Sequence, residues 1–286
     1  MSFSSKVKEE LIEVSGNSRH CNMAELSAIV HFVGKIREDG KEIDIPVENE
    51  AAYQKAFTLL LKTFNINSIT SSILESIKID YDSEGRIDIK KAADGRLLKR
   101  SCCKRAFLRG AFLAVGSVSN PEKAYHMEFV CDSKALADQL IEIMSSFDIE
   151  AHSIIRKKYY VVYIKESEAI VNLLNVIGAH TSLMDLENMR ILKEISNDIN
   201  RRVNCEAANI VKAVNAASKQ MEDIVYIRDN FGLSNLPEKL REIAQVRLEN
   251  PSVTLKELGE LLDPPVGKSG VNHRLRKLSE LADSLR

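Results

Sequence analysis

A histidine–cysteine pair in the first half of the chain aligns with a cysteine–cysteine pair 82 residues later. His20 and Cys21 occupy the same places in the first half of the chain as Cys102 and Cys103 do in the second. Thiolates and imidazoles are zinc ligands, so this correspondence would suit a shared thiol or zinc site. The pairs show neither CxxC nor HxxxH spacing, however, and we interpret the cysteines as buried packing residues. We therefore expect no metal and no cofactor.

Other patterns of enzymatic chemistry are missing from the sequence, which contains no P-loop and no GxSxG motif. His31 lies in an apolar stretch, where a histidine is more often a hydrogen-bonded core residue than a ligand. The five cysteines are odd in number and form no CxxC pair. This usage indicates reduced thiols and no disulfides.

The last fifty residues carry a pattern typical of DNA recognition. They divide into three predicted helices, "LPEKLREIAQVRLEN", "TLKELGELL" and "SGVNHRLRKLSEL". The second begins with a capping-box pattern, Thr254 and Glu257, and we expect Ser269 to be the N-cap of the third. We expect the second helix to bury Leu255, Leu258, Leu261 and Leu262. The rigid turn "DPPVGK" separates it from the third.

The third predicted helix has an apolar face and a basic face. Val271, Leu275 and Leu278 form its buried stripe. A helix, a turn and a basic helix are the layout of a helix-turn-helix, whose second helix enters the major groove. Asn pairs with adenine and Arg with guanine, while Lys, Ser and the helix N-terminus suit a phosphate. The predicted DNA-binding residues are Lys268, Ser269, Asn272, His273, Arg276 and Lys277. The alternative is a three-helix packing module with a solvated basic face.

A second basic cluster lies near the middle of the chain. Residues 86–109 hold nine Lys or Arg against two acids, although the whole chain has a net charge of −1. These nine are Arg86, Lys90, Lys91, Arg96, Lys99, Arg100, Lys104, Arg105 and Arg109. Such a cluster indicates a polyanionic partner, or else a solvated basic face.

An internal duplication accounts for the spacing of these features. "LSAIVHFVG" aligns with "LRGAFLAVG" at an offset of 82, and "TLLLKTFNINS" aligns with "IEIMSSFDIEA" at an offset of 83. We predict the same order in each copy: helix, strands, helix, strands, helix. "SSILESIKIDYD" and "SIIRKKYYVVYIK" are predicted strands, and Ser167 and Gly178 bound the closing helix of the second copy.

The first helix of each copy is apolar on nearly all sides and ends at a glycine, Gly34 or Gly116. A helix of this kind is buried. Ala28 and Gly110 are small residues at matched positions, so we expect the two helices to pack closely about a pseudo-two-fold axis. The strands would then extend to both sides as one saddle.

The connector between the duplicated part and the C-terminal module is predicted to be one long helix. It begins near Ser182, where Asp185 completes a capping box, and it continues to about Asn230. An apolar stripe follows it, at Val203, Ile210, Val214, Ala217, Met221 and Ile224. We expect this stripe to be buried against the duplicated domain, the C-terminal module or another copy of the chain. Gly232 ends the helix, and Pro237 lies in the first turn of the next one.

Length and composition limit the number of globular cores and the class of protein. A chain of 286 residues, with 44% hydrophobic and 28% charged residues, suits two or three globular cores. The N-terminus has no signal-peptide pattern, and no stretch is long and apolar enough for a membrane span. We expect a cytoplasmic protein that does not associate with membranes.

The duplicated unit, with its small-residue helix ending in Gly, resembles the LAGLIDADG homing endonucleases, and in particular the version of that fold found in the bacterial WhiA regulators. The resemblance to WhiA covers essentially the whole chain, including "FLRGAFLAVGSVSNP", "NRRVNCEAANIVKA" and "ELGELLDPPVGKSGVNHRLRKL". It implies an α+β fold: a duplicated LAGLIDADG-like saddle domain followed by an all-α helix-turn-helix domain. The implied divisions are residues 1–100, 101–195, a connecting helix over 196–232, and 233–286.

In the endonucleases an acid just before the last glycine of each motif holds the divalent metals. Val33 and Val115 stand at these positions, and His31 and Leu113 replace the other motif acid. Valine cannot coordinate a metal. Glu38, Asp39 and Glu122 are the nearest acids, and they would have to reach back to the helix ends. We therefore expect no enzyme, with a residual metal-dependent nuclease as the alternative.

The resemblance further implies a regulator of cell division, chromosome segregation or sporulation, acting on double-stranded DNA near the nucleoid. Other transcription factors or RNA polymerase components would be its protein partners. In a third interpretation the duplicated domain is a protein adaptor, and only the C-terminal module binds DNA. Candidate contacts of the duplicated domain with the DNA backbone are Arg100, Lys104, Arg105, Arg156, Lys157 and Lys158.

Overall fold

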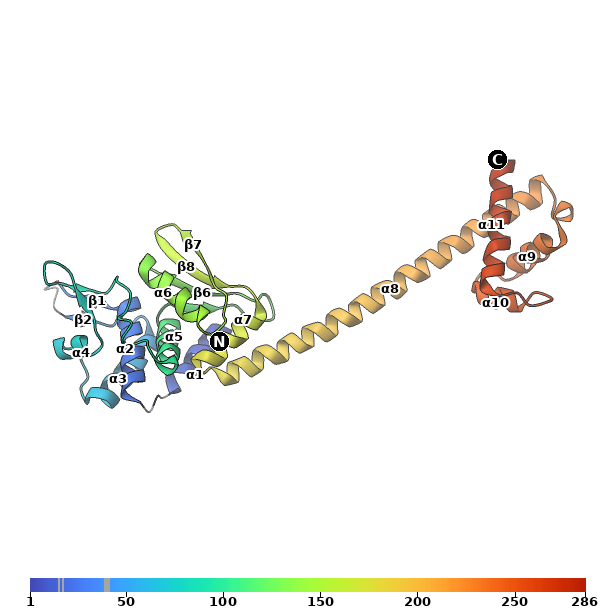
Figure 1. The fold of residues 1–286 in the computed structure, drawn as a ribbon. Helices are drawn as coiled ribbons and strands as arrows, with labels where there is room; N and C mark the ends of the chain where they lie inside the picture. Colours follow the sequence, from blue (N-terminus) through green and yellow to red (C-terminus); the bar gives the residue numbers. More distant parts are fainter. Residues whose placement is uncertain (15, 17, 39–41) are drawn as a thin grey trace. The chain divides into compact units, whose positions relative to one another are not determined.

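A computed structural model describes residues 1–14, 16, 18–38 and 42–286. The chain divides into two compact units, Met1–Lys193 and Glu194–Arg286 (Figure 1). Among the described residues, no helix has the length and apolar character needed to cross a membrane. The acid Asp39, one of the candidate replacements for the nuclease acids, lies outside the described residues.

The first unit holds both copies of the repeat, but the copies differ in strand content. The first copy comprises α1 (Phe3–Glu13), α2 (Arg19–Val33), β1 (Lys35–Ile36), β2 (Ile43–Asp44), α3 (Glu50–Phe64), α4 (Ser71–Ser76), β3 (Asp80–Tyr81) and β4 (Ile87–Asp88). The second comprises α5 (Ser101–Val115), β5 (Gly116–Val118), β6 (Met127–Cys131), α6 (Lys134–Ser145), β7 (His152–Arg156), β8 (Tyr159–Ile164) and α7 (Ser167–Ile177). The second copy forms one antiparallel sheet in the order β5-β6-β8-β7, whereas the first forms two separate two-stranded ladders.

Several local predictions for the repeat are wrong. "SSILESIKIDYD" begins as helix α4 rather than as a strand, because Ile73, Leu74 and Ile77 have a helical spacing that buries all three. Residues 89–100 form turns and bends, so the described part of the first copy has no closing helix. Helix α7 does end at Gly178, which has a φ of 93°, but its N-cap is Glu166 rather than Ser167.

The helices that carry the aligned apolar stretches of the two copies, α2 and α5, lie side by side in Figure 1 and form the centre of the unit. A Cβ added at Gly110 would lie 2.5 Å from the carbonyl oxygen of Glu25 and 3.0 Å from Cβ of Ala28. The predicted close approach at Ala28 and Gly110 is therefore confirmed. Both helices also end at the predicted glycines, Gly34 and Gly116.

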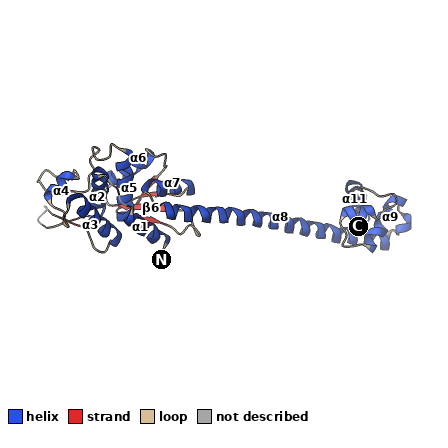
Figure 2. Cartoon of the chain, turned by 90° about the horizontal axis from the view of Figure 1, so that it is seen from below, coloured by secondary structure: helices blue, strands red, loops and turns tan. Residues whose placement is uncertain are grey.

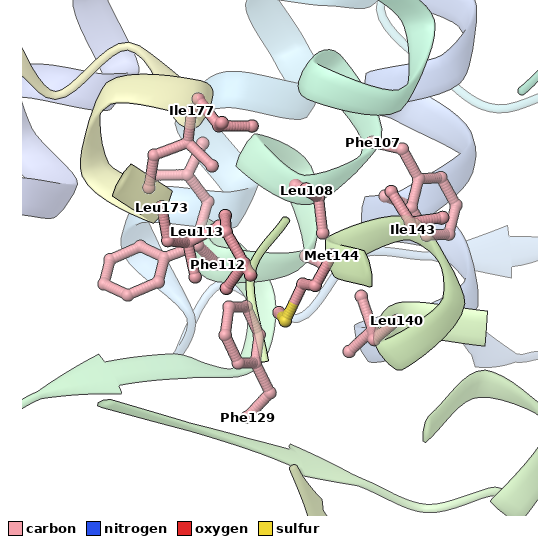
Figure 3. Close-up of a cluster of buried hydrophobic side chains, with 14 of the residues drawn as sticks. Phe107, Leu108, Phe112, Leu113, Phe129, Leu140, Ile143, Met144, Leu173 and Ile177 are labelled. Carbon is pink, nitrogen blue, oxygen red and sulfur yellow. The ribbon is translucent and has the colours of Figure 1, made fainter. Parts of the chain in front are cut away.

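Aromatic and aliphatic side chains of α5 build the larger core of this unit. Figure 3 shows Phe107, Leu108, Phe112 and Leu113 meeting residues of the sheet, α6 and α7. The ring centroids of Phe112 and Phe129 lie 5.8 Å apart in an edge-to-face arrangement. Because α5 is covered on nearly all sides, it acts as the axis of the second copy.

A buried ion cluster joins α2, α3 and α5. The guanidinium of Arg109 donates two hydrogen bonds to the Glu25 carboxylate, at 2.9 and 2.7 Å. The ammonium of Lys55 lies 3.4 Å from the same carboxylate and donates to the carbonyl oxygens of Leu11, Ile12 and Val14. Burial lowers the pKa of Lys55, and Glu25 offsets part of that effect. Arg109 therefore binds inside the protein and does not belong to an exposed basic surface.

Helix α8 (His180–Asn230) is continuous, as the connector prediction required, but its N-terminus is capped differently. The carboxylate of Glu10 accepts hydrogen bonds from the backbone N–H groups of Thr181 and Ser182 and from the hydroxyl of Ser182. Burial alone would raise the pKa of Glu10, but these hydrogen bonds lower it overall. Ser182 thus lies within the first turn and is not the N-cap.

The two units of one chain leave most of the α8 stripe exposed, so its expected burial against the duplicated domain or the C-terminal module is wrong for most of its length. Burial against another copy of the chain stays a prediction. Val203, Ile210 and Val214 are 56%, 64% and 56% exposed, and only Ile224 is fully buried. The stripe lies in the middle of a long helix, and the side chains of α8 that join the two cores lie toward its ends, such as Leu186 and Ile227. The middle of α8 therefore keeps an uncovered apolar side.

The second unit is helical, as the colouring in Figure 2 shows. After the end of α8 it comprises η1 (Leu233–Asn235), α9 (Glu238–Glu249), α10 (Leu255–Glu260) and α11 (Lys268–Leu285). Gly232, with a φ of 88°, ends α8 as predicted, and Pro237 is the N-cap of α9. Its core joins Ile224 and Ile227 to residues of α9, α10 and α11.

Candidate nucleic-acid interface

The exposed face of α11 lies opposite a core formed by α9, α10, α11 and the end of α8. Val271, Leu275 and Leu278 are buried as predicted, and they hold the helix against α9 and α10. The capping box of α10 is present in full: the Thr254 hydroxyl accepts from the Glu257 N–H, and the Glu257 carboxylate accepts from the Thr254 N–H. Leu258 and Leu262 are buried, but Leu261 is 53% exposed and Leu255 only half-buried, contrary to prediction.

The turn before α11 depends on a close backbone contact. The N–H of Val266 donates to the carbonyl oxygen of Gly259 at 2.9 Å. A Cβ added at Gly259 would collide with the Val266 carbonyl oxygen. Only glycine fits here, and the contact sets the angle at which the chain enters α11.

All six predicted DNA-binding residues lie on α11 and are exposed. They are Lys268, Ser269, Asn272, His273, Arg276 and Lys277. Arg276 is within 3.2 Å of Glu280 one turn along the helix, but its side chain stays 68% exposed. Such an exposed pair contributes little to stability and is easily exchanged for another acceptor. The face therefore offers both amide and guanidinium donors to an external partner.

The N-terminus of α11 has no cap from a side chain. Its N-cap is Gly267, so the prediction of Ser269 at this place is wrong by two residues. The first backbone N–H groups of a helix carry partial positive charge and bind anions. With Lys268 and Ser269 exposed in the first turn, this end of α11 is suited to a phosphate.

A groove of about 1020 Å³ lies next to the same helix end. Its lining includes Val214 and Met221 from α8, Pro251 from the loop after α9, and Lys268 and Asn272 from α11. Two of the predicted DNA-binding side chains therefore border an apolar hollow as well as solvent.

The basic residues of the first unit are divided between exposed and internal roles. Arg86, Lys91 and Arg96 pair with neighbouring acids, and Arg109 is buried. Arg100 and Arg105 are exposed and Lys104 is half-buried. The guanidinium of Arg105 lies 5.6 Å from the centre of the Phe147 ring.

The other candidate contacts with the DNA backbone, Arg156, Lys157 and Lys158, lie on the hairpin between β7 and β8. Arg156 ends β7, and its guanidinium lies 3.5 Å from Glu128. Lys157 and Lys158 form the turn to β8 rather than part of a strand, because Lys157 has a φ of 57°. All three are exposed.

The C-terminal ends of α2 and α5 carry no carboxylate at the positions of the nuclease acids. Val33 and Val115 are the last residues of the two helices. The ammonium of Lys8 donates to the carbonyl oxygen of Leu113 at 3.1 Å, and the amide of Asn49 donates to that of Ala114 at 2.5 Å. A positive side chain thus satisfies the negative end of α5.

The other acids and His31 do not form a replacement site in the part of the chain that the structure describes. Glu38 is exposed, and Glu122 is exposed in a turn where its N–H bonds to Asn120. His31 is buried, and its Nδ1 lies 2.8 Å from the carbonyl oxygen of Ile89, as expected for a core histidine. Burial lowers the pKa of His31, which favours the neutral ring.

The two thiol and imidazole pairs come together at the opposite ends of these helices. One ligand atom from each of His20, Cys21, Cys102 and Cys103 lies within 4.8 Å of the others. Cys21 and Cys103 are buried as predicted. Cys102 is exposed, so its interpretation as a buried packing residue is wrong. Burial first, and then the neighbouring thiols Cys102 and Cys103, raise the pKa of Cys21 to about 12.

Comparison with known proteins addresses the whole chain. The chain is 49% identical to the "Probable cell division protein WhiA" of Lachnoclostridium phytofermentans, over 100% of both chains. It is 42% identical to the protein of the same name from Clostridium novyi, over 100% of this chain and 99% of the other. The chain belongs to the WhiA family.

The WhiA family models match the parts described above. The WhiA LAGLIDADG-like domain matches residues 104–196, and the WhiA C-terminal HTH domain matches residues 199–282, which include the six predicted residues of α11. A crystal structure of full-length DUF199/WhiA from Thermotoga maritima is 25% identical, with a TM-score of 0.58 over 100% of this chain and 99% of that chain. These matches confirm the fold class and the family identified from the sequence.

Proposed function

We propose that this member of the WhiA family is a non-catalytic regulator that binds specific sequences of double-stranded DNA through α11. Its relatives are named probable cell division proteins, and we extend that role to this chain. Control of transcription, with effects on cell division, chromosome segregation or sporulation, is the form of regulation that a helix-turn-helix domain suits best. The protein would then associate with the nucleoid.

The exposed polar and basic face of α11 is the observation that carries this proposal. Asn272 and Arg276 lie one turn apart on that face and can reach adjacent bases, where each has a matching pair of donors and acceptors. Lys268 and the uncapped N-terminus of α11 would bind the neighbouring phosphate.

The ends of α2 and α5 support the non-catalytic part of the proposal. Magnesium requires oxygen ligands, and Val33 and Val115 supply none. The ammonium of Lys8 at the end of α5 would moreover repel a divalent cation at that place. Incubation of the protein with supercoiled plasmid and Mg²⁺ should therefore produce no nicked or linear DNA. Cleavage that EDTA abolishes would show that the chain is a nuclease.

The first unit would add contacts that do not depend on sequence. Arg100, Arg105 and the hairpin residues Lys157 and Lys158 are exposed cations that suit phosphate oxygens. They would equally suit an acidic surface of RNA polymerase or of another transcription factor. We place sequence recognition in α11 alone.

The decisive experiment measures DNA binding by the full chain. Fragments that the protein enriches from genomic DNA supply the probe, and affinity is measured by fluorescence anisotropy across a salt series. Replacing Asn272→Ala or Arg276→Ala should weaken binding to the enriched fragment by about tenfold or more, because each removes a bidentate base contact. Binding to unrelated DNA should change much less.

Arg228→Ala is a matched control for this experiment. Arg228 is an exposed arginine of the second unit that pairs with Asp229 at 2.8 Å on α8, away from the predicted face. It should bind DNA like the wild type. Equal losses for all three variants, or full binding by Arg276→Ala and Asn272→Ala, would contradict recognition by α11.

A further inference from the structure

The cluster of His20, Cys21, Cys102 and Cys103 has no role in the proposed DNA recognition. His20 and Cys21 are the second and third residues of α2, and Cys102 and Cys103 are the second and third residues of α5. The two copies of the repeat therefore present one pair each from the same turn of the same helix. Close packing of α2 against α5, at Gly110 and Ala28, brings the two first turns together.

The separations within the cluster suit a single metal ion. Nδ1 of His20 lies 3.3 Å from Sγ of Cys103 and 3.3 Å from Sγ of Cys21, and no pair of ligand atoms is more than 4.8 Å apart. A tetrahedral zinc ion, with Zn–S near 2.3 Å and Zn–N near 2.0–2.1 Å, places its ligand atoms about 3.5–3.8 Å from one another. Small rotations of the side chains would bring all four atoms to these distances.

The chemistry of the four side chains also favours zinc. Three thiolates and one imidazole form a Cys₃His set, which leaves no open position and is typical of structural zinc. The N-terminal ends of α2 and α5 meet at the cluster, and a bound zinc ion deprotonates the thiols that coordinate it. Cys102 is exposed, so the ion has a path of entry, whereas Cys21 and Cys103 would shield it from the other side.

We propose that His20, Cys21, Cys102 and Cys103 bind one structural zinc ion, which ties the N-terminal end of α2 to that of α5. The ion would hold together the two copies of the repeat at the end of the helix pair that lies opposite Val33 and Val115. This proposal is independent of DNA recognition by α11.

Zinc binding would also change the position of Arg100. The Arg100 guanidinium lies 3.1 Å from Nε2 of His20, where a guanidinium can only donate. An imidazole that binds zinc through Nδ1 carries its proton on Nε2, which would then not accept from Arg100. Zinc binding would thus free the guanidinium from this hydrogen bond. The site is thereby linked to one of the candidate DNA-backbone contacts.

The test measures metal in the intact chain. Protein purified without chelators or tags that bind metal is analysed by mass spectrometry of the elements, and we expect about one zinc per chain. Cobalt(II) added to the metal-free protein should give the intense visible absorption of a tetrahedral ion and the ultraviolet charge-transfer band of cobalt thiolates. Cys102→Ser should lower the affinity for zinc about tenfold or more. Because Cys102 is exposed, this variant should keep the fold and the circular dichroism of the wild type.

Cys205→Ser is the matched control, since Cys205 is an exposed cysteine of α8 outside the cluster. It should retain zinc at the wild-type level. The proposal is overturned if the wild-type chain binds neither zinc nor cobalt, or if Cys102→Ser binds zinc as tightly as the wild type does. A native disulfide among the three thiols in protein free of metal, or iron in place of zinc, would also overturn it. None of these results depends on whether α11 binds DNA.

Discussion

Helices α5 and α11 both carry cations near an apolar stripe, yet they use them in opposite ways. Arg109 of α5 is 7% exposed and binds the carboxylate of Glu25 on α2. Arg276 of α11 is largely exposed and pairs with Glu280 of its own helix. The difference follows from the surroundings of each helix. Arg109 lies on the covered part of α5, so its charge must be neutralised inside the protein, whereas Lys104 and Arg105 near the start of α5 reach the surface. An amphipathic helix such as α11 leaves its charges to an external partner.

The same contrast appears at the N-termini of the helices. Glu10 caps α8, and Thr254 with Glu257 caps α10, whereas α11 has no side-chain cap. Helices α2, α5, α6, α7 and α9 also lack a side-chain cap, so the missing cap alone does not set α11 apart. What distinguishes its N-terminus is the exposed Lys268 and Asn272 beside it.

The largest expected effect comes from removing the charge at the centre of the buried cluster. Glu25→Gln would leave Arg109 and Lys55 buried as two cations without a counter-charge, at a cost of about 3–5 kcal/mol to the first unit. Arg109→Met should cost less, because Lys55 still neutralises Glu25. Urea unfolding followed by circular dichroism, with hydrogen exchange of α2 and α5 peptides, measures both.

Glu84→Gln serves as the control for this pair. Glu84 is an exposed acid that pairs with Arg86 at 2.8 Å, so its loss should change stability by about 0.5 kcal/mol or less. If Arg109→Met destabilised the unit more than Glu25→Gln does, then Arg109 and Lys55 would not share the carboxylate as the structure indicates.

The second largest effect on stability is expected at Gly110, where α5 packs closely against α2. Gly110→Ala places a methyl group 2.5 Å from the Glu25 carbonyl oxygen, and overpacking of this kind costs about 1–3 kcal/mol. Alanine also raises helix propensity by about 1 kcal/mol, which opposes the loss. Gly95→Ala meets no atom within 4 Å and should be close to neutral. Net stabilisation by Gly110→Ala in thermal unfolding would mean that α2 and α5 are farther apart than described.

Much of the contrast between the internal helix α5 and the amphipathic helix α11 was predictable from local sequence. The matched apolar stretches and their terminal glycines identify α2 and α5, and the pairing of Ala28 with Gly110 indicates their close approach. The capping box at Thr254 and the stripe from Val271 to Leu278 likewise define the C-terminal helices. These signals depend on neighbours within a few residues, or on a repeat that can be aligned.

What could not be predicted depends on partners that are distant in the chain. Glu10 caps a helix that begins 170 residues later, and nothing near Ser182 indicates it. Arg109 looks like part of a basic segment until the position of Glu25 is known. The four cysteine and histidine ligands align across the repeat, but their convergence follows only from how α2 crosses α5. Sequence therefore predicts elements better than it predicts helix caps or the partners of buried charges.

A smaller effect is expected on the salt dependence of DNA binding, which should differ between the exposed cations of the two units. Lys268→Ala should weaken DNA binding about equally for all sequences and lower the slope of log affinity against log salt by about one, because it removes one phosphate contact. Arg105→Ala should change the slope less, because its guanidinium lies over the Phe147 ring at 5.6 Å. Anisotropy titrations from low to moderate salt measure both slopes. A larger change for Arg105→Ala would place the main DNA contact in the first unit.

The smallest expected effect concerns the helix end that the protein caps for itself. Glu10→Gln should lower stability by about 0.5–1 kcal/mol at neutral pH, since the cap is only partly buried. Because hydrogen bonds lower the pKa of Glu10 below its ordinary value of 4.5, the wild-type advantage is complete above that pH. It should disappear as the pH falls through the lowered pKa. Parallel unfolding curves of variant and wild type from pH 7 to pH 3 measure this convergence. A difference in stability that stayed constant with pH would show that Glu10 acts by packing. The N-terminus of α8 would then lack a charged cap, as the N-terminus of α11 does.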